Sequence, residues 1–333
     1  DASRSVPAVS SLVNDDESAK EKYKALIKND YEKVRESHKK RTSERKIISI
    51  SKARENKLKT NWDKAGIVKP ESLGVTILND YPLSELKKYI DWTPFFLTWE
   101  LKGKYPAIFE SEKYGSEAKR LFEDANQLLD KLINKKLIRA NGIFGLFPAN
   151  SIGDDIEIYS DESRKGVRAV FHTIRQQQEK SDSIPNIALA DYIAPKETGI
   201  KDYIGAFAVT AGIGVDDIVK KYEEEHDDYS SIIVKALADR LAEAFAEHLH
   251  ELVRKKFWGY APEEEFSNDD LIKENYQGIR PAPGYPACPD HSEKRALFDL
   301  LQAERVGIEL TESYAMSPAA SVSGLYVSHP EAS

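Results

Sequence analysis

The feature that most constrains the fold is a long run of helical periodicity at residues 229–257. Its apolar side chains recur at the spacing of one helix face. The predicted buried stripe consists of Ile233, Leu237, Leu241, Phe245, Leu249, Leu252 and Val253. A second amphipathic helix is predicted at residues 117–136, and shorter helices at residues 83–90 and 94–101. Thr93 is placed to cap the last of these, with Pro94 at its first position.

Elsewhere the apolar period changes to that of strands. Residues 142–148 and 155–159 flank a turn at residues 151–154, which predicts a β-hairpin. Further strands are predicted at residues 187–193, 203–209 and 321–327. The sequence has no internal repeat and no strict alternation of strands and helices, which argues against a doubly wound parallel sheet. We therefore predict an α+β fold with a largely antiparallel, bent sheet and helices packed around it.

Charge and composition narrow the class of protein. The chain has 333 residues and a formal net charge of −8, which argues against nucleic acid or an anionic membrane as the main partner. No apolar run approaches the roughly 20 residues that a membrane-spanning helix needs. The one cysteine, Cys288, excludes an internal disulfide and a multi-cysteine metal site, and it fits a reducing, cytoplasmic setting.

The first part of the chain differs from the rest. Residues 1–60 are highly charged, with a helical pattern at residues 19–34 and a basic block at residues 38–46. The block is either a solvated linker or a nucleic-acid contact, and the lack of interleaved aromatic residues favours the linker. Residues 61–333 have the composition of a single compact domain. The chain begins with neither a start methionine nor a signal peptide, so we expect it to be part of a longer polypeptide.

A stiff loop at residues 280–291 carries the strongest functional signal. It contains four prolines, a glycine and an aromatic ring next to Arg280. Prolines reduce the entropy lost when a ligand binds, and Gly284 permits a positive φ and a close approach of the backbone. Arg280 offers a planar fork of donors that suits a carboxylate. From these residues alone, the loop is either a ligand cradle or a proline-rich surface turn.

The long predicted helix carries two further groups of polar side chains. Asp239, Glu243 and Glu247 share one of its faces, either as a solvated acidic stripe or as the polar edge of a ligand pocket or partner site. His248 and His250 point to different sides of the helix, so they do not suit one metal ion.

Catalytic and metal-binding motifs give little support for a standalone enzyme. The sequence has no HExxH, GxSxG, GxxxxGK[ST] or GxGxxG pattern. The run His226-Asp-Asp228 is either a helix cap or a cation site. We therefore expect no catalytic residue and no metal site in this chain.

Several blocks of the sequence resemble one family. Arg280-Pro-Ala-Pro-Gly-Tyr285 resembles the Arg-x-x-x-Gly-Tyr motif of the S-adenosylmethionine-binding activation domain of cobalamin-dependent methionine synthase. Longer stretches resemble the same family at residues 89–96, 145–150, 153–159, 202–210, 235–247 and 274–280. The resemblance implies that residues 1–60 are the tail of a preceding cobalamin-binding domain followed by an interdomain linker, and that residues 61–333 are the activation domain.

The resemblance implies a role in repairing an oxidised cofactor. In this family the activation domain presents S-adenosylmethionine to cob(II)alamin, and an electron from flavodoxin or a similar donor completes reductive methylation to methylcobalamin. The implied partners are flavodoxin and the cobalamin-binding domain of the same polypeptide, while cobalamin and zinc are held by other domains. The whole enzyme is a methyltransferase that makes methionine, which this fragment alone is not expected to do. The alternative is a docking module that mainly recruits flavodoxin and the cobalamin domain.

The same resemblance implies which loop residues contact the ligand. Arg280 would pair with the carboxylate of S-adenosylmethionine. Ala282 and Gly284 would offer backbone groups, and their small size would let the ligand come close. Tyr285 would flank the ligand.

Acidic residues outside the loop are implied as well. Asp91 would meet the α-ammonium or hydroxyl groups of the ligand, and its alternative role is a local cap of the helix at Pro94. Glu243, and more weakly Asp239, would lie near the pocket. A carboxylate close to the sulfonium would favour the cationic ligand over its neutral product.

A last expectation concerns the C-terminus. Members of the resembled family continue past the His329-Pro330 pair with a strand whose tyrosine contacts the ligand. This chain stops at Ser333, so that tyrosine is absent and one wall of the pocket is expected to be open. We expect the domain to fold regardless, because the apolar stripes of its core are intact.

Overall fold

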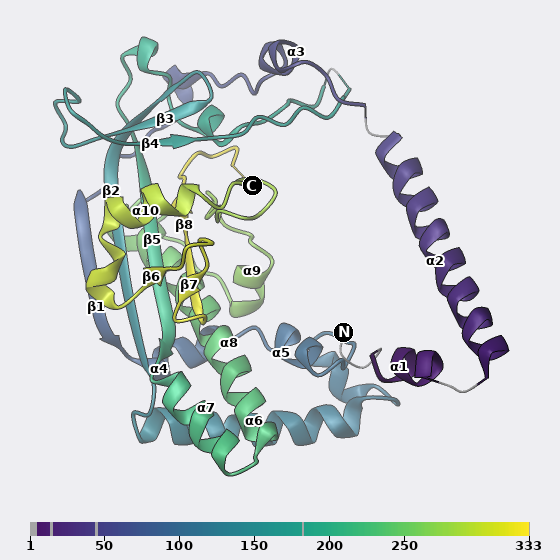
Figure 1. The fold of residues 1–333 in the computed structure, drawn as a ribbon. Coiled ribbons are helices and arrows are strands. Elements are labelled where there is room, and N and C mark those ends of the chain that lie inside the picture. The colour runs from purple at the N-terminus through teal and green to yellow at the C-terminus, as the bar shows by residue number, and fades with distance from the viewer. Residues whose placement is uncertain (1–4, 14–15, 44–45, 182, 333) are drawn as a thin grey trace. The chain divides into compact units, whose positions relative to one another are not determined.

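The chain folds into two compact units in a computed structural model that describes residues 5–13, 16–43, 46–181 and 183–332 (Figure 1). The smaller unit contains residues 1–57 and 176–186, and the larger unit contains residues 58–175 and 187–333. No helix among the described residues is long and apolar enough to span a membrane.

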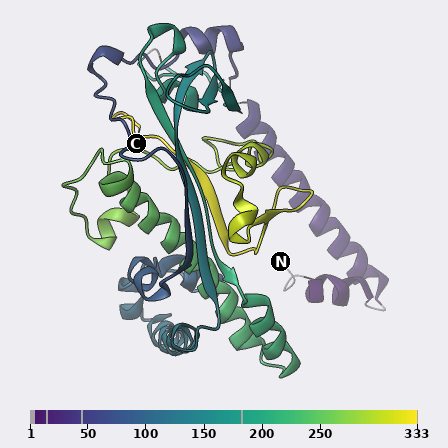
Figure 2. The same cartoon turned by 90° about the vertical axis from the view of Figure 1, so that its left-hand side faces the viewer.

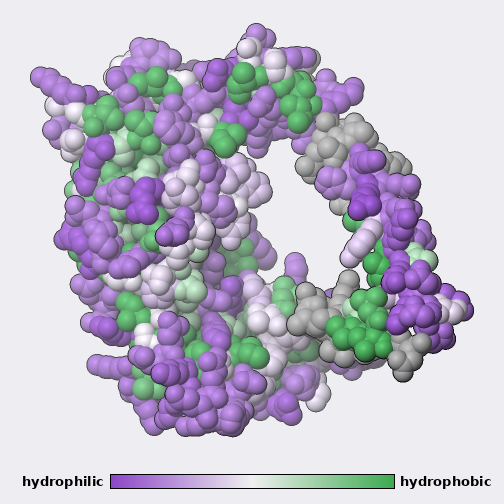
Figure 3. Space-filling view, viewed as in Figure 1, coloured by the Kyte–Doolittle hydropathy of each residue, from purple (hydrophilic) through white to green (hydrophobic). Residues whose placement is uncertain are grey.

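The smaller unit is helical. Its helices are α1 (Ser5–Val13), α2 (Glu17–Ser43) and α3 (Ile50–Glu55). The helix predicted at residues 19–34 is therefore confirmed and is longer than predicted. Hydrophobic side chains gather on α1, whereas α2 is mostly hydrophilic (Figure 3). The basic block predicted at residues 38–46 lies partly outside the described residues.

Two distant segments of this unit are joined by backbone hydrogen bonds. Residues 46–48 pair with residues 177–179, through hydrogen bonds from the Ile48 amide to the Gln177 carbonyl (2.9 Å) and from the Glu179 amide to the Lys46 carbonyl (2.7 Å). Further along, the Asn186 amide donates to the carbonyl of Asn56 at 2.8 Å. The segment that leads into α3 is thus held by a stretch of chain far away in the sequence.

The larger unit contains the sheet and the remaining helices. Its helices are α4 (Leu83–Leu86), α5 (Thr93–Thr98), α6 (Gly115–Asn134), α7 (Val215–Glu224), α8 (Asp228–Leu252), α9 (Asn268–Ile272) and α10 (Glu293–Leu301). Its strands are β1 (Gly74–Tyr81), β2 (Arg139–Ile152), β3 (Asp155–Tyr159), β4 (Val167–His172), β5 (Asp202–Ile213), β6 (Glu309–Leu310), β7 (Met316–Ser317) and β8 (Ser321–Tyr326). A π-helical turn, Val253–Phe257, follows α8.

The main sheet has six strands and is antiparallel throughout. Its order is β4-β3-β2-β5-β8. The strand β1 pairs with residues 140–146 of β2, whereas β3 pairs with residues 149–152 of the same strand. The strand β8 therefore lies at one edge and pairs with β5 from Gly205↔Tyr326 to Thr210↔Ser321. The strands β6 and β7 form a separate two-stranded sheet.

Helices lie on both faces of the sheet (Figure 2), and the buried side chains form two hydrophobic cores. One core contains Phe144, Phe207 and Tyr326 of the sheet together with buried residues of α6 and α8. The other contains residues of opposite parity such as Phe147 together with buried residues of α10. The helix α8 comes close to the sheet because Gly142 lies beneath it, where a Cβ atom would be 2.9 Å from the Phe245 ring. Strands buried on both faces explain the nearly continuous apolar runs of β2 and β5.

Most predicted elements are confirmed. The predicted stripe of the long helix is buried in α8, apart from partly exposed Leu252. The predicted hairpin is β2–β3, and β5 and β8 match two of the predicted strands. Asp227 is the predicted cap, since its carboxylate accepts the Ser230 amide at 3.0 Å.

Two local predictions are wrong. The run at residues 187–193 is not a strand but contains a 3-10 helix, Leu189–Tyr192, because the carboxylate of Asp191 accepts the Ala188 amide and pairs with buried Arg175. Thr93 is the first residue of α5 rather than its cap. Asp91 accepts the Thr93 amide at 2.9 Å and so takes the capping role.

Candidate functional site

The proline-rich loop begins as an extra pairing partner at the free edge of β8. Ile279 and Val327 exchange two backbone hydrogen bonds of 3.0 Å. The carbonyl of Pro281 then accepts the amide of Leu325 at 2.9 Å. The backbone on both sides of Arg280 is thereby fixed to the sheet, which limits where its side chain can point.

Beyond Pro281 the loop folds onto itself. The Gly284 amide donates to the Cys288 carbonyl at 2.7 Å, and the Cys288 amide donates to the Tyr285 carbonyl at 2.9 Å. Gly284 has a φ of +104°, and a Cβ atom there would lie 2.2 Å from Cε1 of His291. Glycine is thus required at this position by the positive φ and by the His291 ring. The contact with His291 was not predicted from the sequence. Burial raises the pKa of the Cys288 thiol to about 11.

Arg280 lies at the centre of a polar cluster. Its Nη2 pairs with Oε2 of Glu247 at 2.7 Å, and its Nη1 donates to the hydroxyl of Tyr276. His250 Nδ1 is 3.5 Å from Nη1, and the exposed carboxylate of Glu274 is 4.0 Å from Nη2. The Arg280 side chain retains 20% of its exposure, so part of the guanidinium faces solvent.

The groups behind Arg280 are buried and neutral. Burial, aided by the charges of Arg254 and Arg280, lowers the pKa of His250 well below its usual range. Burial also raises the pKa of the Tyr276 and Tyr326 hydroxyls. The His250 ring stacks on Tyr326 with centroids 5.1 Å apart, so a packed aromatic wall backs the guanidinium.

The acidic stripe of α8 divides between surface and interior. Asp239 and Glu243 are exposed, whereas Glu247 is only 6% exposed and pairs with Arg280. Asp91 is half-buried, and one of its oxygens caps α5. Among the described residues, none of Asp91, Asp239 and Glu243 makes an ion pair or hydrogen bond with Arg280.

Sequence reasoning therefore missed two residues next to the loop. Glu247 was recognised only as a member of the acidic stripe, and Tyr276 was not singled out at all. The available signal was spacing, since Glu247 follows Glu243 by one helical turn and Tyr276 precedes Arg280 by four residues.

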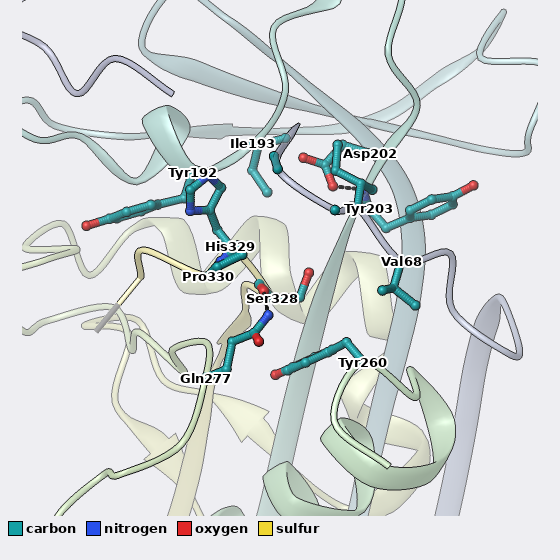
Figure 4. Close-up of a pocket in the computed structure, with 13 residues that line it drawn as sticks. Val68, Tyr192, Ile193, Asp202, Tyr203, Tyr260, Gln277, Ser328, His329 and Pro330 are labelled. Atoms are coloured by element: carbon teal, nitrogen blue, oxygen red, sulfur yellow. Dashed lines mark hydrogen bonds between the residues drawn. The ribbon is translucent and has the colours of Figure 1, made fainter. Parts of the chain in front are cut away.

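A small pocket lies elsewhere in the larger unit (Figure 4). Tyr260, Gln277, Ser328 and His329 are among its lining residues. Asp202 also lines it, and burial raises the pKa of this carboxyl to about 6, against the hydrogen bonds from the Ala194 and Tyr203 amides. None of the residues predicted to contact the ligand lines this pocket. Among the described residues, no group of three or more His, Cys, Asp or Glu side chains is arranged to hold a metal ion.

Comparison with known proteins identifies the family. The family model of the vitamin B12 dependent methionine synthase activation domain matches residues 82–333. The chain belongs to this family. It is also similar to the crystal structure of the MetH reactivation domain bound to AdoHcy, with a TM-score of 0.84 and 55% sequence identity over 86% of this chain and 88% of that chain.

The activation-domain fold agrees with the α+β architecture predicted from the sequence. The predicted residues Arg280, Ala282, Gly284 and Tyr285 lie in one loop at the β8 edge of this activation domain, and the Tyr285 ring is 64% exposed. Their ligand contacts stay predictions, as do those of the three acidic residues. The loop thus carries one partly exposed arginine and, five residues on, an exposed tyrosine, residue types that suit a small ligand with a carboxylate at one end.

Proposed function

We propose that this chain is the S-adenosylmethionine-binding reactivation domain of a cobalamin-dependent methionine synthase, which is a methyltransferase. The observation that carries the proposal is the 55% identity, over most of both chains, to a reactivation domain bound to AdoHcy. AdoHcy is the product that S-adenosylmethionine becomes on losing its methyl group, so the two ligands share the adenosine and the amino-acid end. A site for one therefore fits the other.

Arg280 is proposed to bind the ligand carboxylate, because it is the partly exposed cation in a loop with a fixed backbone. Tyr285 is proposed to flank the ligand, and the backbone at Ala282 and Gly284 to contact it. Asp91 keeps one carboxylate oxygen without a hydrogen bond among the described residues, and we propose that this oxygen meets the α-ammonium or hydroxyl groups. Glu243, with Asp239 more weakly, is proposed to lie near the sulfonium.

The proposed reaction transfers a methyl group to cob(II)alamin. The bond between sulfur and methyl carbon breaks, and the sulfonium becomes a neutral thioether. The cobalamin of the neighbouring domain would supply the methyl acceptor, and one electron from flavodoxin or a similar donor would balance the transfer. The domain's part is to bind and orient the methyl donor, while the cofactor supplies the chemistry.

The proposal extends to the rest of the polypeptide. Residues 1–60 are proposed to be the tail of the cobalamin-binding domain and a charged linker, and residues 61–333 the activation domain. The placement of residues 1–57 in a unit other than the one that holds most of residues 61–333 supports this division, although residues 176–186 belong to the same smaller unit. Cobalamin and zinc are assigned to other domains, so the fragment alone is not expected to make methionine.

Isothermal calorimetry tests the proposed function. The wild-type chain should bind S-adenosylmethionine and S-adenosylhomocysteine, and Arg280→Ala should weaken both by about tenfold to a hundredfold through loss of a charge-assisted pair. Arg295→Ala is the matched control, because Arg295 is an exposed arginine on the neighbouring helix α10. Undetectable binding to a folded wild-type chain would instead favour a docking module that mainly recruits flavodoxin and the cobalamin domain.

A further inference from the structure

We infer that Glu247 is a positioning residue that holds the guanidinium of Arg280 with one edge free for the carboxylate of the ligand. The inference rests on the proposed function, because it takes the ligand to be an S-adenosyl amino acid. It adds a residue to the site that neither the loop motif nor the predicted acidic contacts include.

Both terminal nitrogens of Arg280 are already engaged by the protein. Oε2 of Glu247 accepts from Nη2 at 2.7 Å, and the hydroxyl of Tyr276 accepts from Nη1. His250 Nδ1 lies 3.5 Å from the same Nη1. These three contacts come from behind the guanidinium, from α8 and from the chain that precedes the loop.

Among the residues that the structure describes, none makes a hydrogen bond to the remaining edge of the guanidinium. Nε of Arg280 makes no hydrogen bond to any described residue. This atom is not fully buried, so a ligand can reach it. A carboxylate can accept two parallel hydrogen bonds from Nε and the nearer hydrogen of Nη2. The contacts with Glu247 and Tyr276 therefore leave the edge formed by Nε and Nη2 free to bind a carboxylate through two hydrogen bonds.

Glu247 is well suited to set this orientation. It is only 6% exposed and lies within α8, between side chains that are themselves buried, so its carboxylate has little freedom. Burial raises the pKa of Glu247, opposed by the nearby charges of Arg280 and Arg254. The two arginines therefore favour the ionised form of Glu247. The ionised carboxylate in turn fixes the orientation of the Arg280 guanidinium.

A competing carboxylate shows what Glu247 prevents. Glu274 is exposed, and its Oε1 is 4.0 Å from the same Nη2 that pairs with Glu247. Without the charge on Glu247, the guanidinium would turn toward Glu274, and its free edge would leave the direction of the loop. Removing Glu247 should therefore weaken recognition of the carboxylate while leaving recognition of the adenosine unchanged.

The test compares two ligands that differ only in the amino-acid part. S-adenosylhomocysteine carries the carboxylate, whereas 5′-methylthioadenosine has the same adenosine and thioether without it. Calorimetry on Glu247→Gln should show S-adenosylhomocysteine bound about tenfold more weakly, the scale of one charge-assisted hydrogen bond, with 5′-methylthioadenosine unchanged. The double variant Glu247→Gln/Glu274→Gln should recover part of the loss, because the competing carboxylate is gone.

The matched control is Asp191→Asn, which removes a buried carboxylate from another arginine, Arg175, at 2.6 Å. It should lower the melting temperature without changing the preference between the two ligands. If Glu247→Gln does not fold, Glu247→Asp carries the test, since it keeps the charge but draws the carboxylate away from Nη2 by one methylene group.

Two results would overturn the inference. One is a Glu247→Gln or Glu247→Asp variant with the ligand preference of the wild type, and the other is an equal loss of both ligands, which would make Glu247 a purely structural residue. A wild-type chain that binds neither ligand would refute the proposed function itself, and that outcome is seen before any variant is made.

Discussion

Replacing Gly284 with alanine tests whether the His291 ring fixes the shape of the ligand loop. The backbone at Gly284 has a φ of +104°, and a methyl group there would lie 2.2 Å from Cε1 of His291. His291 is exposed but its Nδ1 lies 3.2 Å from Nζ of buried Lys294, so the added methyl group must break this contact to displace the ring. The left-handed backbone costs a residue with a Cβ atom about 1–2 kcal/mol, and overpacking adds about 1–3 kcal/mol. We therefore expect Gly284→Ala to lower the free energy of unfolding by about 2–5 kcal/mol.

Urea denaturation followed by circular dichroism measures this loss. The control is Gly199→Ala, where φ is +71° and no atom lies within 4 Å of the added methyl group, so that only the backbone cost of about 1–2 kcal/mol applies. His291→Ala should remove the steric part, which makes the double variant Gly284→Ala/His291→Ala more stable than the sum of the single effects by about 1–3 kcal/mol. Additive effects, or a Gly284→Ala cost equal to that of the control, would refute the role of His291.

Three further predictions concern single side chains. The pKa of Asp202 is raised from 3.8 to about 6, so its contribution to stability is present below pH 4 and is lost as the pH rises through 6. The difference in unfolding free energy between wild type and Asp202→Asn should therefore change by about 2 kcal/mol between pH 4 and 8, and a pH-independent difference would contradict it. Asp191→Asn should cost about 1–3 kcal/mol in urea denaturation, because Arg175 loses two charge-assisted hydrogen bonds while its pair with Asp154 remains; a cost below about 0.5 kcal/mol would contradict the pairing. Tyr285→Ala should change stability by less than about 0.5 kcal/mol, since the ring is 64% exposed, yet it should weaken binding of S-adenosylhomocysteine in calorimetry. Unchanged affinity would remove Tyr285 from the site.

The elements that could be predicted from the sequence are those whose apolar residues lie on one face. The stripes of α6 and α8 repeat at helical spacing over several turns, so burial of one face was the simplest arrangement. The strand β1 was missed because its side chains are mostly partly exposed, which leaves no clear alternation of buried and exposed positions. The run at residues 187–193 was assigned to a strand from its apolar pattern. That pattern gives no sign that Asp191 accepts a hydrogen bond from Arg175, which follows β4.

The candidate site divides in the same way. The loop residues were found because proline, glycine and arginine signal a stiff, charged turn, and because they resemble a family motif. The partners of that loop come from elsewhere in the fold. Glu247 reaches Arg280 from α8, and His291 covers Gly284 only after the loop has folded back, so neither contact has a local pattern in the sequence.

A crystal structure of this chain with S-adenosylhomocysteine would show whether Arg280 binds the ligand carboxylate. We expect the carboxylate within about 2.7–2.9 Å of Nε and Nη2 of Arg280, with the pair between Arg280 and Glu247 retained. Tyr285 should lie beside the ligand. A ligand bound away from the loop at residues 280–291, or a carboxylate that faces solvent while Arg280 pairs only with Glu247, would refute the proposed site.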